Sequence, residues 1–330
     1  MVYCVLMNEN VLNQIFDAIN NAKKILIVSH VNPDGDTLGT MCALKLYLKD
    51  KADTLIQTSA QAGIPDTYGF LPGINSSKYL DTVQNIYDLV IAVDVASIDR
   101  IVQNARVIFD SARMTINIDH HKTNNGYGKL NWVVGNASSA GEVLYDIFKA
   151  KNVPVSKEMA ECLYVSILTD TGCFRYENTS PKTLEIAAEL IRLGANNADL
   201  AKKCYNNKPK NMILFQSAVV SKTKFLFNNK VAIAAITQED YKKFDAKNEY
   251  TEGIAETLRT IKSVEISAVL KENDNGDTKV SLRSDNVDVC EIVKRFNGGG
   301  HIHAAGCTIR KPLKIATELL VDEIEKCLNL

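Results

Sequence analysis

The sequence has little of the features that identify several common classes of protein. Its 38 basic and 39 acidic side chains nearly cancel to a formal net charge of -1, so we expect no bulk attraction to duplex DNA or to an anionic membrane. Its eight cysteines include no C-x-x-C pair, which fits neither a zinc knuckle nor a compact disulfide framework. The apolar start, residues 2–7, is too short to span a bilayer and lacks a basic leader. We therefore expect a cytoplasmic protein; the oligomeric state stays open, and a homodimer is one option.

The chain does contain alternating strand and helix patterns. With 330 residues, 46% of them hydrophobic, it is long enough for two domains with full cores. Three apolar runs are typical of parallel strands buried on both faces: residues 24–29, 88–93 and 115–118. Segments with helical periodicity or capping signals lie around them: residues 8–21, 37–49, 139–149 and 156–168. This alternation predicts an α/β fold with a doubly wound, mainly parallel sheet.

After Gly194 the chain becomes polar and rich in asparagine and lysine. We place a large N-terminal domain at residues 1–194, a helical linker at 195–222 and a smaller α+β domain at 223–330. In the smaller domain, strands over 264–270 and 279–283 should pair across the polar turn between them.

Acids and imidazoles follow the predicted strands of the first domain. They are His30, Asp34 and Asp36 after the first strand, Asp94 after the second, Asp119, His120 and His121 after the third, and Asp170 at a helix end. Because ligands in open α/β sheets bind at the carboxyl ends of the strands, most of these groups should meet. Four carboxylates in one cleft repel one another unless divalent cations neutralise them. Each residue alone could be a turn or a helix cap, but their joint occurrence favours a pair of ions such as Mn²⁺ over zinc.

The same segments resemble a known family. Residues 30–36, 93–94, 119–121 and 169–176 resemble, in this order, the four motifs of the DHH-family phosphoesterases. Arg283-Ser284 and residues 298–306 resemble the DHH-associated C-terminal domain of those proteins. The resemblance is strongest to the branch with nanoRNase and 3'-phosphoadenosine 5'-phosphate (pAp) phosphatase activity. It implies hydrolysis of very short oligoribonucleotides and of linear dinucleotides such as pApA to mononucleotides, and of pAp to AMP.

The resemblance also implies roles for the residues at the strand ends. His30, Asp34 and Asp94 would hold one Mn²⁺, and Asp36, Asp94, His120 and Asp170 would hold the other, with Mg²⁺ or Co²⁺ as alternatives. Water activated between the two ions would attack the phosphorus. His121 would act as the general acid or as a phosphate-stabilising donor. Asp119 would orient an imidazole.

A phosphate grip is expected in the smaller domain. Gly298, Gly299 and Gly300 allow a loop whose backbone approaches an anion closely, and His301 adds a donor there. Arg283, followed by Ser284, can form a bidentate phosphate contact. Arg175 could contact phosphate near the metals or pair with a ligand carboxylate, and its role stays open. Holding a far phosphate in this way would favour short oligonucleotides over long strands.

Three alternative functions remain. A cyclic-dinucleotide phosphodiesterase would use the same chemistry, but the sequence shows no added sensory domain. A polyphosphate or pyrophosphate hydrolase is disfavoured by the glycine-rich segment with Arg283. An inactive nucleotide-binding or tRNA-interacting module is disfavoured because all six metal-binding positions carry suitable side chains.

Overall fold

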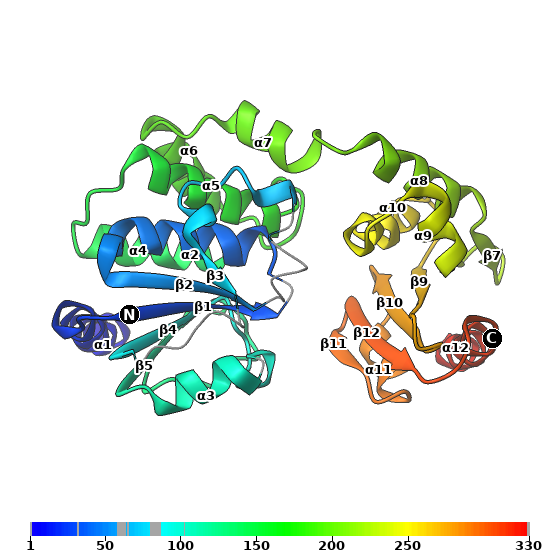
Figure 1. Cartoon of the computed structure of the whole chain (residues 1–330), viewed down its shortest axis with the longest axis horizontal. Coiled ribbons are helices and arrows are strands. Elements are labelled where there is room, and N and C mark those ends of the chain that lie inside the picture. The colour runs from blue at the N-terminus through cyan, green and yellow to red at the C-terminus, as the bar shows by residue number, and fades with distance from the viewer. Residues whose placement is uncertain are drawn as a thin grey trace. The chain divides into compact units, whose positions relative to one another are not determined.

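The computed structural model describes residues 2–31, 33–57, 64, 66–79, 87–101 and 103–328, and Asn32 of the first motif lies outside them. The chain divides into two compact units, Met1–Asn207 and Lys208–Leu330 (Figure 1). Each unit is built on its own sheet. In the described part of the chain, no helix is long and apolar enough to cross a membrane.

The first unit is built on a parallel sheet. Its strands are β1 (Ile25–Val31), β2 (Ala52–Gln57), β3 (Lys78–Tyr79), β4 (Leu89–Val93), β5 (Met114–Asp119) and β6 (Leu130–Val133). They lie in the order β3-β2-β1-β4-β5-β6, and every neighbouring pair is parallel. The chain winds outward from β1 in one direction and from β4 in the other, so the switch point lies between these two strands. Ligands of doubly wound sheets bind outside the carboxyl ends of the strands at such a point. The predicted fold class is confirmed.

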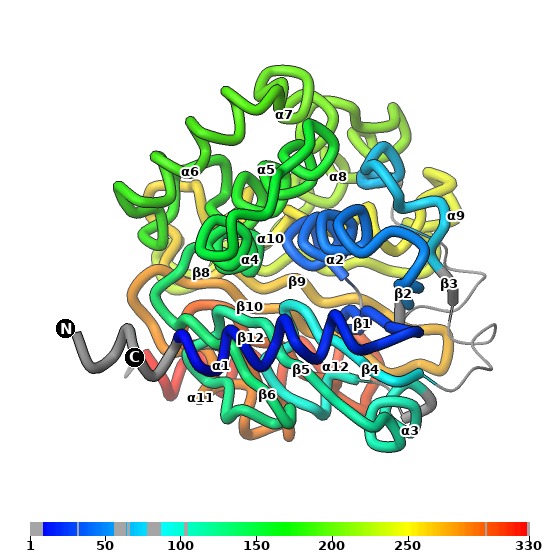
Figure 2. The backbone as a smooth tube through the Cα atoms, turned by 90° about the vertical axis from the view of Figure 1, so that its left-hand side faces the viewer, coloured from blue at the N-terminus to red at the C-terminus, as the bar shows by residue number. Residues whose placement is uncertain are grey.

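Helices cover both faces of this sheet. They are α1 (Val2–Asn21), α2 (Gly35–Leu48), α3 (Gln103–Ser111), α4 (Ala140–Ala150), α5 (Lys157–Asp170), α6 (Pro181–Arg192) and α7 (Asn197–Tyr205). Alternate residues of β1 enter different cores: Ile25 and Ile27 pack in the core of α2, α4 and α5, whereas Leu26 and Val28 pack in the core of α3. Figure 1 shows α2 and α4 on one side of the strands and α3 on the other. In Figure 2, α1 crosses the sheet where the strands begin, which leaves their carboxyl ends to the other elements.

Serine caps fix the starts of three helices. The side chains of Ser139, Ser156 and Ser180 accept the backbone N–H three residues further on, which starts α4, α5 and α6. Residues 139–142 have the sequence of a capping box, Ser-x-x-Glu, but the box is incomplete, because the Glu142 carboxylate accepts from Ser138 instead of reaching back to Ser139. The sequence interpretation also missed β2, β3, β6, α3 and α7, which are short or weakly patterned.

The second unit is built on a mixed sheet. Its strands are β7 (Lys224–Leu226), β8 (Val231–Ile236), β9 (Ile266–Glu272), β10 (Thr278–Ser284), β11 (Gly299–His301) and β12 (Ala304–Ile309), in the order β11-β12-β10-β9-β8-β7. Only β8 and β9 pair in parallel among the described strands of this unit. The predicted pairing of β9 with β10 is confirmed. The predicted glycine loop was wrong in part, because Gly299 and Gly300 belong to an edge strand paired with β12.

The helices of the second unit leave part of its sheet uncovered. They are α8 (Lys210–Ser221), α9 (Gln238–Phe244), α10 (Ile254–Arg259), α11 (Val289–Lys294) and α12 (Leu313–Cys327). One core joins α11 and α12 to one face of the sheet, and a second core joins α8, α9 and α10 to β8 and β9 on the other face. On that second face lies every other residue of β10 and β12, and these residues are exposed or half-buried.

Candidate metal centre

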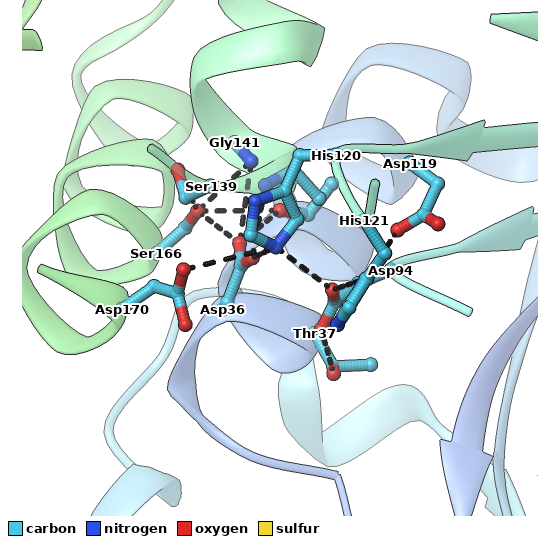
Figure 3. Close-up of polar contacts among 12 residues, drawn as sticks. Asp36, Thr37, Asp94, Asp119, His120, His121, Ser139, Gly141, Ser166 and Asp170 are labelled. Carbon is cyan, nitrogen blue, oxygen red and sulfur yellow. Dashed lines mark hydrogen bonds and ion pairs between the residues drawn. The ribbon is translucent and has the colours of Figure 1, made fainter. Parts of the chain in front are cut away.

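The predicted ligands of the first unit gather at the carboxyl ends of β1, β4 and β5. Figure 3 shows four of them, Asp36, Asp94, His120 and Asp170, close together. His30 is the penultimate residue of β1, Asp94 directly follows β4, and His120 directly follows β5. Asp36 lies in the first turn of α2, and Asp170 is the last residue of α5. Chain segments far apart in sequence therefore supply one site at the switch point of the sheet.

The imidazole of His120 lies among three carboxylates. Its Nε2 atom is 3.5 Å from Asp36 Oδ2, 3.5 Å from Asp94 Oδ1 and 3.7 Å from Asp170 Oδ2. These distances are too long for strong hydrogen bonds. The donor atoms of Asp36, His120 and Asp170 all lie within 4.8 Å of one another, as expected of groups arranged around an ion.

His30, Asp34 and Asp94 form the adjoining group. Their donor atoms also lie within 4.8 Å of one another, and His30 Nε2 is 3.6 Å from Asp94 Oδ2. Asp34 caps α2 as well, because its Oδ1 atom accepts from the backbone nitrogen of Thr37 at 3.1 Å. Asp94 lies between the two groups, since its other oxygen faces His120.

Asp94 carries the clearest sign of a cation-binding role. It is 3% exposed, and its Oδ1 atom has no hydrogen-bond partner among the described residues. Its Oδ2 atom accepts from the hydroxyl of Thr37 at 2.6 Å. Its φ of 56° lies in the left-handed region, which non-glycine residues enter mainly where the surrounding structure demands it. A buried carboxylate oxygen without a donor fits coordination of a cation.

Asp36 is held in place by its neighbours. It is 1% exposed, and its Oδ2 atom accepts from the backbone nitrogen of Ala140 at 2.9 Å. Its Oδ1 atom accepts from Ser166 Oγ at 2.5 Å and from Thr40 Oγ1 at 3.2 Å. Contacts of this kind orient a carboxylate before any ligand binds.

Burial and mutual repulsion shift the pKa values of the acids. Burial raises the pKa of Asp36 well above its ordinary value, and the charge of Asp94 adds to the shift. Burial likewise raises the pKa of Asp170 to about 7. Burial would raise the pKa of Asp94 too, but its interactions with His120 and His30 outweigh this and lower it.

The histidines shift in the complementary direction. Burial would lower the pKa of His120, but its interaction with Asp94 and the charges of Asp36 and Asp170 raise it to about 10. The pKa of His30 is also raised, because its interaction with Asp94 outweighs burial. Without a metal, the site therefore holds protons on groups that a divalent cation would deprotonate.

The residues present fit a pair of divalent cations. Four carboxylates and two imidazoles form an oxygen-rich set with no described thiol in it, which suits Mn²⁺ or Mg²⁺ better than a structural zinc. The other ring nitrogens face carbonyl groups, His30 Nδ1 at 2.7 Å from Val31 O and His120 Nδ1 at 3.3 Å from Ala137 O. This arrangement leaves both Nε2 atoms directed at the carboxylates, as in many metal-binding histidines.

His121 is paired with Asp119 beside the metal-ligand groups. Its Nδ1 atom is 2.8 Å from Asp119 Oδ1, and Asn124 Nδ2 donates to Asp119 Oδ2 at 2.6 Å. Asp119 is fully buried, and burial alone would raise its pKa, but the interaction with His121 lowers it. The Asp119 carboxylate therefore stays charged and orients the His121 ring. His121 Nδ1 is also 3.6 Å from Asp94 Oδ1, which places the ring at the edge of the site.

The predicted phosphate-binding residues have mixed placements. Arg283 lies on the uncovered face of β10, 32% exposed, and its Nε atom donates to Glu256 Oε1 at 2.8 Å. Gly299 is exposed on β11, whereas Gly298 is packed so tightly that an added Cβ would lie 2.5 Å from Cys307 Cβ. Gly300 has a φ of 149°, which requires glycine. The side chain of His301 lies outside the described residues.

Ser284 is placed differently from the prediction, and Arg175 lacks one of the two contacts considered for it. Ser284 is fully buried and its hydroxyl donates to the carbonyl of Val287, so the predicted substrate contact through this side chain is not supported. The exposed Arg175 donates from Nε to Gly172 O at 2.6 Å, and no ion pair joins it to a ligand carboxylate among the described residues. It follows a left-handed segment formed by Gly172, Cys173 and Phe174.

The sequence interpretation missed the hydroxyls that support the ligands. Thr37 and Thr40 follow Asp36 on α2, and Ser166 lies four residues before Asp170 on α5. Residues four apart share one helix face, so the spacing alone could have placed Ser166 beside the site. Asn178 was also missed; its Nδ2 atom donates to the backbone oxygen of Asp170 at 3.1 Å.

Comparison with known proteins gives consistent matches. The model of the DHH family, N-terminal domain, matches residues 24–167, and the model of the DHHA1 domain matches residues 228–330. The chain is 32% identical, over 86% of its length and 88% of the relative's, to a probable bifunctional oligoribonuclease and PAP phosphatase NrnA of Streptococcus mutans. It is 30% identical, over 87% of its length and 84% of the relative's, to the bifunctional oligoribonuclease and PAP phosphatase NrnA of Thermus thermophilus. Its fold is similar to the crystal structure of an exopolyphosphatase-related protein from Bacteroides fragilis, with a TM-score of 0.90 at 27% identity over 96% of both chains.

Proposed function

The chain belongs to the DHH family of phosphoesterases with a DHHA1 domain, and from this premise we propose that it is a Mn²⁺-dependent hydrolase of very short oligoribonucleotides, pApA and pAp. The products would be mononucleotides from the oligonucleotides and AMP from pAp. The observation that carries this proposal is the buried Asp94 carboxylate, placed between two ligand groups and with one oxygen lacking a donor. The relatives' names supply the substrate class.

Six side chains would hold two ions. His30, Asp34 and Asp94 would bind one, and Asp36, Asp94, His120 and Asp170 would bind the other. Bound ions would lower the pKa of water and offset the negative charge that develops on the phosphoryl group. Asp36 and Asp94 are buried, and the hydroxyls of Thr37, Thr40 and Ser166 fix the orientations of these two carboxylates.

His121 would move the proton of the reaction. Because Asp119 holds its Nδ1 atom, Nε2 is the ring nitrogen that would exchange a proton with the leaving ribose oxygen. The charged carboxylate of Asp119 would hold the His121 ring in position during that transfer. The Asp119–His121 pair would thus act as the general acid next to the ions.

The second unit would bind a phosphate distant from the cleaved bond. Arg283 has its Nε bonded to Glu256 and its Nη1 bonded to the carbonyl of Leu282, so the guanidinium has a fixed orientation. The exposed Gly299 of edge strand β11 would let a phosphate approach the backbone. We expect such a contact to favour short oligonucleotides over long strands.

A substrate panel tests the proposal. Purified protein with Mn²⁺ should hydrolyse pAp, pApA and RNA of two to five residues, and should lose that activity in EDTA. RNA of 20 residues and pyrophosphate should be hydrolysed far more slowly. Cyclic di-AMP as the fastest substrate would replace the proposal with the cyclic-dinucleotide alternative, and equal rates per end for RNA of all lengths would refute the length preference. Mg²⁺ and Co²⁺ in place of Mn²⁺ would identify the ions that support turnover.

A further inference from the structure

The uncovered face of the second sheet is a continuous surface of small side chains. On this face, Ser281 of β10 lies beside Gly306 of β12, and Gly306 lies beside Gly299 of β11. We call these three residues the floor. An added Cβ at Gly299 would meet nothing within 4 Å, so the space above the floor is open. The opposite side chains of the same strands, such as Val280 and Leu282, pack in the core with α11 and α12. The floor is therefore exposed on a sheet whose other face is fully packed.

Two lysines face each other at one end of this floor. Lys279 of β10 and Lys271 of β9 are direct cross-strand partners, and like charges in such positions destabilise a sheet. The Lys271 ammonium donates to Thr251 Oγ1 at 3.0 Å and to Asn248 Oδ1 at 3.4 Å, both neutral groups. Lys279 is exposed, and no ion pair to it is found among the described residues. Burial, reinforced by the charge of Lys279, lowers the pKa of Lys271 to about 8.

The other end of the floor carries Arg283. It lies four residues along β10 from Lys279 on the same face, which corresponds to roughly 13 Å at about 3.3 Å per residue. One phosphate cannot contact both positions across that distance. A stacked single strand carries one phosphate per about 3.4 Å, so about four nucleotide steps would connect them.

We propose that Lys279, supported by Lys271, forms a second phosphate subsite on this face, and that its ligand is the backbone of a single-stranded oligonucleotide also held at Arg283. An anion between the two ammonium groups would offset their repulsion. The small side chains between the subsites let the strand lie close to the sheet. The inference rests on the proposed function for the identity of the strand, but the binding itself can be measured without hydrolysis.

The test compares binding of a 5'-phosphorylated RNA pentamer to the full chain in EDTA by calorimetry, from 50 to 200 mM KCl. Lys279→Ala should weaken binding by roughly tenfold, because a charged hydrogen bond to the strand is removed. The slope of log affinity against log salt should fall by about 0.7 for each phosphate that the variant no longer neutralises. The matched control is Lys314→Ala on α12, which removes the same charge from the helix on the opposite face and should change neither quantity.

Turnover of pAp with Mn²⁺ separates this inference from the proposed function. pAp is too short to reach both subsites, so Lys279→Ala should leave its hydrolysis unchanged. Pentamer binding that is equal in wild type and Lys279→Ala, or equally weakened by Lys314→Ala, would overturn the subsite even if pAp is hydrolysed. A poly-glutamate peptide that displaces the pentamer at equal charge concentration would overturn the nucleic-acid ligand. Absence of all hydrolysis would refute the proposed function, while pentamer binding that depends on Lys279 would still support the subsite.

Discussion

Each of the two sheets of this chain brings like charges together, but the charges are negative in the first unit and positive in the second. In the first unit, buried carboxylates such as Asp36 and Asp94 converge where helices exclude water. In the second, Lys271 and the exposed Lys279 meet at the border between the part of the sheet that α8, α9 and α10 cover and the part that they leave open. Either cluster is unfavourable alone, because like charges repel. The first cluster fits cations and the second fits an anion, which are the two kinds of charge present when a metal-dependent enzyme binds a phosphoester.

The difference in burial has consequences for rigidity. Asp36 is fixed by backbone and hydroxyl donors from three helices, α2, α4 and α5, so its geometry is set before an ion binds. No hydrogen bond or ion pair to the Lys279 ammonium is found in the described part of the chain, so its long side chain can follow a ligand of variable shape. A reaction centre needs the first arrangement, whereas a contact with a flexible strand tolerates the second.

The largest effect should come from Asp94. Asp94→Asn keeps the shape of the side chain, and asparagine tolerates the left-handed φ of 56° at this position. It removes the one charge that both ligand groups share, so hydrolysis of pAp and pApA should fall on the order of 10³-fold or more. The measurement is initial rate at saturating Mn²⁺.

The control for this substitution is Asp99→Asn, five residues further on, where the carboxylate is 86% exposed and pairs with Arg106. It should retain full activity. Circular dichroism should show both variants folded, and a folded Asp94→Asn protein with wild-type rates would exclude the site.

The pH dependence of metal binding should be the next largest effect. Without metal, the pKa of Asp170 is raised to about 7 and that of His120 to about 10, so both carry protons at pH 6. An ion must displace those protons, which means that its affinity rises with pH and is lost as pH falls. For each group that must release a proton, the apparent affinity for Mn²⁺ rises roughly tenfold per pH unit at pH values below the pKa of that group. Affinity for Mn²⁺ should therefore rise by about two to three orders of magnitude from pH 6 to pH 8.

Calorimetry of Mn²⁺ binding in buffers with different ionisation enthalpies measures this directly. We expect net proton release near pH 6.5 and a smaller release above pH 8. Affinity that does not vary with pH would show that the carboxylates and imidazoles do not bind the ion.

Ser166 should have a smaller effect on the same site. Ser166→Ala removes the hydroxyl that donates to Asp36 Oδ1 and leaves the carboxylate itself in place. Outer contacts of this kind are worth about 10- to 100-fold in metal affinity or activity. Because only the ion-binding step should suffer, raising the Mn²⁺ concentration should restore most of the rate.

Ser221→Ala on α8 is the matched control for Ser166→Ala. Its hydroxyl donates to the carbonyl of Ala218 in its own helix, so metal affinity should not change. A loss in Ser166→Ala that no Mn²⁺ concentration rescues would show that Ser166 acts in the chemical step instead of in holding Asp36.

The metal-ligand groups could be anticipated from sequence because topology determines where they go. His30, Asp94 and His120 each end a strand with a strong apolar pattern, and parallel strands deliver their ends to one edge. The supporting hydroxyls were missed because serine and threonine also occur on ordinary helix surfaces, although the four-residue spacing of Ser166 from Asp170 placed both side chains on one face of α5. Ser284 shows the opposite error, since its place beside Arg283 predicted a substrate contact that its full burial does not support.

The fold was predictable where hydrophobic runs are long and unpredictable where elements are short. β1, β4 and β5 are fully buried along nearly all of their length, so their composition alone identifies them. β11 spans three residues, two of them glycine, and it is defined by pairing with β12 instead of by its own preferences. Glycine in sequence indicates freedom of the backbone, but only the partner strand shows that this freedom is used in a sheet.

The smallest expected effect is on stability, and it compares glycine-to-alanine substitutions at one position in each unit. An added Cβ at Gly39 would lie 2.5 Å from the backbone oxygen of Cys162, so Gly39→Ala must push α2 away from α5 and should lower the free energy of unfolding by about 1–3 kcal/mol. Gly299→Ala places its methyl group in open space and should change that free energy by no more than about 0.5 kcal/mol. Urea denaturation of both variants measures the contrast. If Gly299→Ala were as destabilising as Gly39→Ala, another part of the protein would have to cover the face of the second sheet, and the oligonucleotide could not bind there.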